Sequence, residues 1–515
     1  MTSFYEELRK NDSISDEKEN EQSRKNVDKW IFGLLLFLIG FMPLVILANV
    51  EEVVSPLVSS LEILSSGMKG ELFTHYKALL VLMVTIITGI MLLAKIVFMG
   101  GTIRKTKMNY VIGVFVIAIV VSTLASPNIT IALGGQHNRS DGAISWLCYV
   151  ALMFIAMNIE YPKNIVRYIM YTMMPFVYIN LYIINRYFYW RDLMGEPWVQ
   201  KLVSITLPEG ATISEGSVLV GTLNQWNYMS GMFAMITIMY LAWAVTSTKW
   251  HEVIIGAITA SAAVIVMFMA ISTSGFLAFS VALIFVIIFV LRTKNKVKAL
   301  VAMLICLILV VPTFNKLAEI DIKVWNESFG FFIKSNPYAD NISMNFEKNN
   351  LVYASDQVIE IPELPESGWS LGTGRLYIWE KTADLIKERL ILGYGADSLI
   401  YNFPHFNIDA RSGLADEKTI TDKAHNGYVS TLYNFGLIAI IAFLVITVLA
   451  LKTVLSSIIS KSVPIFILSS ITIAYFIQNL FNDSLPAITA FVFVIMGIMF
   501  SLLDSSNRKD EISGR

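Results

Sequence analysis

Arg375 is the leading candidate for a functional side chain in this apolar sequence. It opens the stretch GTGRLYIWEKTADLIKERLILGYG, which predicts an amphipathic helix. The apolar residues recur with helical spacing at 376, 379, 383, 386 and 390. A cation in a first turn opposes the helix dipole, so an external anion would relieve its cost. Guanidinium suits phosphate, and the free N–H groups of a helix start, which Thr373 could cap, would complete an anion site. An ion pair with Glu366 or Asp422 is the alternative.

His425 is the candidate proton acceptor. It lies in DKAHNGYVSTLYNFGLIAII, where a polar segment enters an apolar run long enough to span a membrane. Histidine titrates near pH 6.5 and could take a proton from a sugar hydroxyl as a general base. A capping or interfacial histidine would have the same sequence. His405, in YNFPHFN, is a competitor, but Pro404 and Phe406 beside it favour packing.

Two further segments carry polar groups that could contact sugar or phosphate. In LGGQHNRSDGAISW, Arg139 is either a second cation of the site or the partner of Asp141 in a local ion pair. In VGTLNQWNYMSG, Asn224, Asn227 and Tyr228 offer amide and hydroxyl groups where an apolar run begins. Polar caps on a membrane helix would look the same.

An aromatic segment and a late polar segment supply lower-ranked candidates. RYFYWRDLMGEPW holds Arg186 and Arg191, which we rank below the other cations as phosphate ligands. Aromatic side chains occur at the interfaces of most membrane proteins. IQNLFNDSLP holds Asp483, a conceivable catalytic carboxylate.

The composition predicts an all-α polytopic membrane protein. Of 515 residues, 55% are hydrophobic and 15% charged, and mean hydropathy is +0.61, whereas soluble proteins carry about 25% charged residues. Net charge is −1, which excludes nucleic acid as a partner at the level of the whole chain. The first apolar run begins at Trp30 and is long enough to span, so we expect it to serve as its own insertion signal.

About twelve apolar runs are long enough to cross a bilayer, which needs about 20 residues per helix. The expected spans lie near 30–50, 78–99, 109–125, 143–158, 164–184, 227–246, 253–271, 275–291, 298–313, 428–451, 463–480 and 486–503. Eleven or thirteen spans remain alternatives, since only STSG separates the seventh from the eighth. The predicted organisation is a disordered cytoplasmic tail (1–28), nine spans (29–313), one large extracytoplasmic loop (314–426) with short amphipathic helices, three spans (427–503) and a cytoplasmic tail (504–515).

The Lys and Arg distribution predicts the orientation. With the N-terminus inside, the short inner loops hold twelve Lys or Arg against two acidic residues, and the short outer loops hold six against ten. Positive residues favour the cytoplasmic side. We therefore expect a multi-pass protein of the cell membrane, with both termini in the cytoplasm and the 314–426 loop outside. That loop holds eleven Lys or Arg against seventeen Asp or Glu, so an anion there needs a few placed cations.

Several function classes lack their motifs. The sequence has five histidines, no H-E-x-x-H pattern and no phosphate-binding loop, so we expect no metal and no cofactor. A lipid-linked oligosaccharide flippase is the rival from another class. Transporters usually show paired halves and broken midplane helices, and neither is evident. A binding or scaffold protein that uses the long loop is a third possibility.

Four of these segments resemble one superfamily, the bacterial O-antigen ligases and Wzy-type polysaccharide polymerases. GTGRLYIWEKTADLIKERLILGYGADS is similar to its R-x3-W helix and P-L-x-G-x-G segment, with Leu390 where proline is common. AHNGYVSTLYNFGLIA resembles its H-N entry into a late span. GGQHNRSDG and GTLNQWNYMSG resemble two further segments, with Asp141 in place of Glu. ISTSGFLAF departs from the family's S-R-G pattern because the arginine is missing.

The resemblance implies a metal-independent glycosyltransferase that uses a glycan donor on undecaprenyl diphosphate at the outer leaflet. Its partners would be that donor, a glycan acceptor, the bilayer and other polysaccharide-assembly proteins. By the same resemblance, Arg375 holds the diphosphate and His425 activates the acceptor hydroxyl. The expected substrate-binding residues are Arg139, Asn227, Tyr228, Trp379, Asn426 and Arg191. We expect polymerisation of capsular, exopolysaccharide or teichuronic-type repeat units; ligation to a different acceptor is the alternative.

Overall fold

The computed structural model describes residues 2–57, 64–208, 218–223, 225–293, 296–333, 335–338, 374–405 and 420–513. For 2–15 and 507–513 it describes the backbone alone. Four residues named above, Asn224, Glu366, Thr373 and Phe406, lie outside the described residues, so the predictions that involve them stay predictions.

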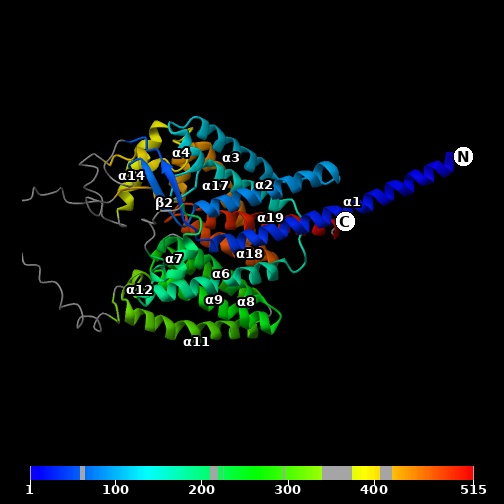
Figure 1. The fold of residues 1–515 in the computed structure, drawn as a ribbon. Coiled ribbons are helices and arrows are strands. Elements are labelled where there is room, and N and C mark those ends of the chain that lie inside the picture. Colours follow the sequence, from blue (N-terminus) through cyan, green and yellow to red (C-terminus); the bar gives the residue numbers. More distant parts are fainter. Residues whose placement is uncertain are drawn as a thin grey trace, which may run out of the picture.

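Each predicted span overlaps one helix of the described chain, and the architecture is that of an all-α polytopic membrane protein (Figure 1). The helices are α1 (Thr2–Phe41), α2 (His75–Phe98), α3 (Lys107–Leu124), α5 (Ala143–Met157), α6 (Ile165–Phe188), α8 (Trp226–Thr246), α9 (Trp250–Met269), α10 (Thr273–Arg292), α11 (Lys296–Ile320), α17 (Gly427–Ser460), α18 (Val463–Gln478) and α19 (Pro486–Ser513). Among the described residues, nine helices are long and apolar enough to cross a membrane. α5 and α18 are shorter apolar helices, and α6 falls in neither group.

The remaining elements are short. They comprise α4 (Ile129–Gly134), α7 (Pro197–Val203), α12 (Lys323–Asn326), α14 (Arg375–Glu388), α15 (Leu399–Asn402), the 3₁₀ turns η1 (Met42–Leu44), η3 (Leu193–Gly195) and η4 (Phe329–Phe331), and the strands β1 (Asn49–Val53) and β2 (Gly67–Glu71). The strands pair antiparallel, with Asn49 opposite Glu71. Sequence patterns did not predict this hairpin.

Both ends of the first helix differ from the prediction. The first span was expected over 30–50, but α1 ends at Phe41 and the chain enters β1 at Asn49. Pro43 ends the helix, because proline lacks a backbone N–H and crowds the preceding turn. At the other end, residues 1–28 were expected to be disordered, whereas α1 is helical from Thr2. Its polar part is rich in helix-forming Glu and Lys, and Lys25 pairs with Glu21 one turn away.

The core of the bundle is α8, which is buried along its whole apolar length. It packs against α9, α10, α11 and α18. Small residues permit the close approach: Gly231 lies against Gln478 of α18, and Gly275 of α10 lies against Ser230. Such contacts are typical of helix packing in membranes.

A break in α17 creates a docking place for the segment that follows α14. Gly436 has a left-handed φ of 77° and interrupts the helix. The backbone N–H of Gly395 donates to the carbonyl of Asn434 (2.9 Å), and that of Leu437 donates to Leu390 (2.9 Å). Irregular backbone is tolerated near a membrane when other protein groups satisfy it.

The bundle has two distinct ends (Figure 1). The hairpin, α4, α7, α12 and α14 gather at one end, and both chain termini lie toward the other. We refer to these as the loop end and the terminal end. On which side of a membrane each end lies stays a prediction.

Candidate functional site

A tight turn between α4 and α5 carries two charged side chains into the loop end. Gly135 has φ 88°, and a Cβ there would lie 2.5 Å from the backbone nitrogen of Asp141. Glycine is therefore needed for the turn to close. Both Arg139 and Asp141 are buried as a result.

Arg139 forms its ion pair with Asp397, which corrects the expected alternative of a pair with Asp141. Its Nε lies 2.8 Å from Asp397 Oδ1, and both side chains are about 6% exposed. Nη2 donates to the carbonyl of Ser484 (3.2 Å). Burial opposes the charge, but the neighbouring carboxylates, Asp397 foremost, raise the pKa of Arg139 above its usual value. Nη1 is buried and has no hydrogen-bond partner in the described part of the chain.

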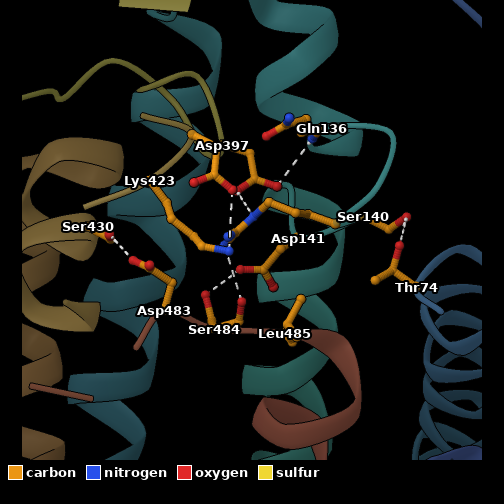
Figure 2. Close-up of polar contacts among 12 residues, drawn as sticks. Thr74, Gln136, Ser140, Asp141, Asp397, Lys423, Ser430, Asp483, Ser484 and Leu485 are labelled. Atoms are coloured by element: carbon orange, nitrogen blue, oxygen red, sulfur yellow. Dashed lines mark hydrogen bonds and ion pairs between the residues drawn. The ribbon is translucent and has the colours of Figure 1, made fainter. Parts of the chain in front are cut away.

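Asp141 has other partners. Its carboxylate accepts a hydrogen bond from the Tyr149 hydroxyl (2.8 Å). Its other oxygen accepts one from the Ser484 hydroxyl (Figure 2). Burial, reinforced by the nearby charge of Asp397, raises the pKa of Asp141 to about 7. Asp141 is thus a positioning group for the turn and for Ser484.

Asp397 is held by the glycine-rich segment after α14. Gly393 (φ 71°) and Gly395 (φ 93°) bend the chain against the break in α17, and Asp397 itself has φ 56°. Aspartate tolerates this conformation better than most residues. Its second oxygen accepts from the backbone N–H of Gln136 (3.2 Å) (Figure 2). The GYGAD segment therefore delivers the counter-ion of Arg139.

The helix predicted around Arg375 exists as α14, but its buried face differs. Tyr377, Ile378 and Ile386 pack into a small core with α15 and the start of α17, whereas Leu376 and Leu390 are exposed. Of the positions that the spacing selected, Ile386 is buried and Leu376 and Leu390 are exposed, so the predicted face was only partly right. Trp379 borders the buried face, and its Nε1 donates to the carbonyl of Ala424 (2.8 Å).

Arg375 begins α14 after Gly374, which has a left-handed φ of 78°. Its side chain is half-buried and makes no ion pair with any described residue. The expected alternative partner Asp422 is instead paired with Lys423 (3.3 Å). Burial lowers the pKa of Arg375, and the charge of Asp483 acts against this shift.

His425 lies where the strained approach to α17 ends, with φ 51°. Its Nε2 is 4.0 Å from Asp422 Oδ1. Burial lowers the pKa of His425, with a further lowering from the charges of Lys423 and Arg375. The imidazole is therefore neutral at pH 7 and can accept a proton. Because the charge of Arg375 reaches His425, both predicted catalytic side chains belong to one cluster.

Lys423 and Asp422 complete this cluster. The Lys423 ammonium lies 5.2 Å from the ring centroid of Tyr228, a cation–π contact. Burial disfavours its charge, but Asp422 and Tyr228 raise the pKa of Lys423 above its usual value. Conversely, burial works against ionisation of Asp422, but Lys423 and His425 lower its pKa. Both groups are charged at neutral pH.

Asp483 joins the cluster from the turn between α18 and α19. One of its oxygens accepts a hydrogen bond from the Ser430 hydroxyl (Figure 2). The other, Oδ2, is buried without a partner among the described residues. Figure 2 places Asp483, Ser484, Lys423 and Asp397 around one centre.

Asn227 and Tyr228 are in the first turn of α8. The side-chain oxygen of Asn227 accepts from Ser272 (2.7 Å), and the Tyr228 hydroxyl is buried with no partner in the described ranges. Asn426 caps α17: its side-chain oxygen accepts from the backbone N–H groups of Tyr428 (3.0 Å) and Val429 (3.2 Å). These contacts explain Asn227 and Asn426 structurally, and substrate contact stays a prediction.

Two other predicted candidates stand apart from this cluster. Arg191 is exposed after α6, and no hydrogen bond or ion pair joins its side chain to the described residues. His405 is buried, and its Nε2 lies 2.9 Å from the carbonyl of Ile400, in agreement with the packing role expected for it.

Residues 255–444 match a family model described as O-antigen ligase. This part of the chain is therefore similar to the O-antigen ligase family. The match confirms the resemblance to the superfamily of O-antigen ligases and Wzy-type polymerases. None of the curated proteins matches the chain significantly.

The match to the O-antigen ligase family indicates glycan transfer of ligase or polymerase type, with a lipid-linked glycan donor and a glycan acceptor in a membrane. The matched region contains Arg375, Trp379, His425 and Asn426. Arg139, Tyr228 and Asp483 lie outside residues 255–444 but contact them. Their partners there are Asp397, Lys423 and Ser430, respectively. The cluster therefore unites the family segment with other parts of the chain.

Sequence reasoning missed Asp397 and Lys423. Both stood in the quoted motifs, GYGADS and DKAHN, but no local pattern distinguished them from solvated loop charges. Within the described residues there is no group of three or more His, Cys, Asp or Glu that could hold a metal ion. Metal independence remains a prediction.

Proposed function

We propose that this protein transfers a glycan from undecaprenyl diphosphate to a glycan acceptor at the outer face of the cell membrane, without a metal. We further propose that it polymerises repeat units of a capsular, exopolysaccharide or teichuronic type. The Lys and Arg distribution supports a cytoplasmic location of both termini, and hence an extracytoplasmic loop end.

One observation carries the proposal: a neutral histidine shares its cluster with three cations, and the cluster retains unused hydrogen-bonding groups. His425 is the base, and Arg375, Lys423 and Arg139 are the cations. Arg139 is already paired through Nε, but its Nη1 is free to donate. Arg375 has no carboxylate partner among the described residues, so the phosphate oxygens of a diphosphate would supply its anionic partner.

The transfer step follows from these roles. His425 takes the proton from an acceptor hydroxyl, and the oxygen attacks the anomeric carbon of the donor sugar. The bond between that carbon and the diphosphate oxygen breaks, and undecaprenyl diphosphate leaves with the electron pair. The cations stabilise the negative charge that grows on the leaving oxygen, which is most effective where water is largely excluded.

Lys423 compensates for the arginine that the family pattern has near Ser272. Ser272 contacts Asn227, next to Tyr228, and the Lys423 ammonium lies over the Tyr228 ring. A cation therefore reaches the same region from the segment before α17. Its compact ammonium acts as a point charge instead of a bidentate donor.

The test uses the purified full-length protein and undecaprenyl-diphosphate-linked repeat units as both donor and acceptor. A polymerase lengthens the glycan and releases undecaprenyl diphosphate in equal amount to the bonds formed. A ligase gives product only when a different acceptor is added. Translocation of the lipid-linked repeat across proteoliposomes without bond formation would instead identify a flippase and overturn the proposal.

A further inference from the structure

A separate pocket adjoins the turn that carries Arg139. It has a volume of about 280 Å³ and is lined by β1, the start of α2, the 134–140 turn and the start of α5. Small-molecule sites have volumes upward of about 300 Å³, so this pocket has room for about one ring. None of the cluster residues Arg375, Lys423 and His425 lines it.

Gln136 gives the pocket an unsatisfied polar group. Its side chain is 2% exposed, and neither Oε1 nor Nε2 has a hydrogen-bond partner among the described residues. A buried carboxamide without partners is costly, and native proteins leave few of them. Its backbone N–H is already used by Asp397, so the residue is fixed in place (Figure 2). The free carboxamide can donate to and accept from a ligand at once.

The other polar groups of the pocket disfavour an anionic ligand. No Lys or Arg is among its lining residues in the described chain, and Glu51 contributes a carboxylate. Burial lowers the pKa of His137 to about 4, with Lys69 adding to the shift, so its imidazole is neutral at pH 7. Ser140 adds a hydroxyl, which lies 3.5 Å from that of Thr74. These groups match hydroxyl and amide groups, not phosphate.

The opposite wall is apolar. Leu79 and Leu82 of α2 and Ile144 and Cys148 of α5 line this part of the pocket. Leu79 and Ile144 are about 40% exposed, so this wall is open toward the side of the bundle. A sugar ring has the matching two-sided character, because its C–H face packs on apolar side chains while its hydroxyls form hydrogen bonds.

We propose that this pocket binds one neutral, hydroxyl-bearing sugar unit of the glycan substrate. The identification as a glycan subsite rests on the proposed function; the pocket's preference for a neutral ring does not. Gln136 links it to the cluster through Asp397, the counter-ion of Arg139. A sugar bound in this pocket would therefore contact the 134–140 turn, which also carries Arg139.

The first test measures binding without catalysis. Saturation-transfer NMR on the full-length protein in nanodiscs uses methyl glucoside, methyl N-acetylglucosaminide and methyl glucuronide as probes. We expect a neutral glycoside to bind the wild type and Gln22→Leu, an identical change at an exposed site, and to bind Gln136→Leu at least tenfold more weakly. The anionic glucuronide should not bind. Equal binding by Gln136→Leu, or no neutral glycoside bound to the wild type, would overturn the inference.

A second variant guards against misfolding. Ile144→Trp fills the pocket from a partly exposed position without touching the turn. It should abolish glycoside binding at unchanged thermal stability, and retained binding would count against the pocket.

Kinetics then identify the source of the sugar. Gln136→Leu should raise KM at least tenfold for either the donor or the acceptor, varied separately, with kcat changed less than twofold. An unchanged KM for both would refute a glycan subsite even if glycosides bind. If the wild-type protein shows no glycan transfer at all, the proposed function is refuted, while the NMR result on glycoside binding still stands.

Discussion

The two ends of this protein both bury charged side chains, but among the described residues only the loop end leaves buried hydrogen-bonding groups without partners. At the terminal end, Lys95 pairs with Asp28 at 2.6 Å and also donates to the carbonyl of Asn158. Arg104 there donates to Ser501 and to the carbonyl of Ile159. At the loop end, Arg139 Nη1, Asp483 Oδ2, the Tyr228 hydroxyl and the Gln136 carboxamide have no partner among the described residues.

Cavity size does not separate the two ends in the same way. The terminal end has a cavity of about 580 Å³, roughly twice the volume of the pocket beside Gln136. Its Lys95 and Arg104 are fully engaged, which is the expected state of ion pairs that hold helices together. Buried groups without partners mark a ligand site better than volume does, because they cost free energy until something binds. We therefore propose that binding and catalysis take place at the loop end.

The largest predicted effect is on His425. His425→Ala should lower the rate of glycan transfer about 10²- to 10⁴-fold, the usual contribution of a general base. Stability should change little, because the side chain is about a quarter exposed and forms no short hydrogen bond with described residues. His251→Ala, at an exposed position, is the matched control and should retain full activity. Retained activity in His425→Ala would remove the proposed base.

The two buried ion pairs test whether the ends differ in function. Asp397→Asn and Asp28→Asn each leave a buried cation without its counter-ion, so each should lower the free energy of unfolding by about 3–5 kcal/mol. Denaturation of the purified variants measures that loss. At a temperature where both variants are folded, only Asp397→Asn should also lose transfer activity. Equal activity in the two variants would erase the distinction between the ends.

Two buried tyrosines, Tyr228 and Tyr240, allow a hydroxyl without a hydrogen-bond partner among the described residues to be compared with one that has a partner. Tyr228→Phe removes a buried hydroxyl without a partner, so stability should rise by about 1 kcal/mol or stay unchanged. Tyr240→Phe removes a hydroxyl that donates to the carbonyl of Met170, so stability should fall by about 1 kcal/mol. Thermal unfolding of both variants gives the signs. A clear loss of stability in Tyr228→Phe would mean that its hydroxyl is already satisfied.

The smallest effect is the pH dependence of the loop end. Because the pKa of folded His425 lies below 6.5, transfer should be constant above pH 7 and fall as the pH drops through that lower pKa. The unfolded chain binds this proton more readily, so the contribution of His425 to stability should fall as the pH drops below 6.5, whereas Asp141, whose folded pKa is about 7, acts in the opposite direction. The difference in the free energy of unfolding between wild type and His425→Ala, measured over this pH range, isolates the contribution of His425. A rate that increases toward acid would contradict a neutral base.

Much of the fold followed from the sequence, because apolar length reports directly on membrane helices. All twelve predicted spans overlap helices, and α14 was found from its spacing. The hairpin was missed, since its strands are short and half polar. The buried face of α14 was only partly predicted, because Tyr377 and Ile378 are buried although they lie beside the positions that the spacing selected.

The site was only partly predictable. Arg375 and His425 were recognised from chemistry and motif, and the structure brings them within electrostatic reach. The partner of Arg139 could not be found, because Asp397 lies 258 residues away and nearby Asp141 was the obvious choice. Lys423 was hidden for another reason: a lysine beside an aspartate in a loop resembles any exposed pair until its burial is known.

The central claim is that the loop end binds a lipid diphosphate through Arg375. Its most direct test is the affinity of undecaprenyl diphosphate for wild-type protein, Arg375→Ala and Arg24→Ala in nanodiscs, since Arg24 is an arginine of the terminal end. We predict binding to the wild type and to Arg24→Ala with the same Kd, and binding to Arg375→Ala at least tenfold weaker. Equal affinity in all three proteins, with Arg375→Ala correctly folded, would contradict the account.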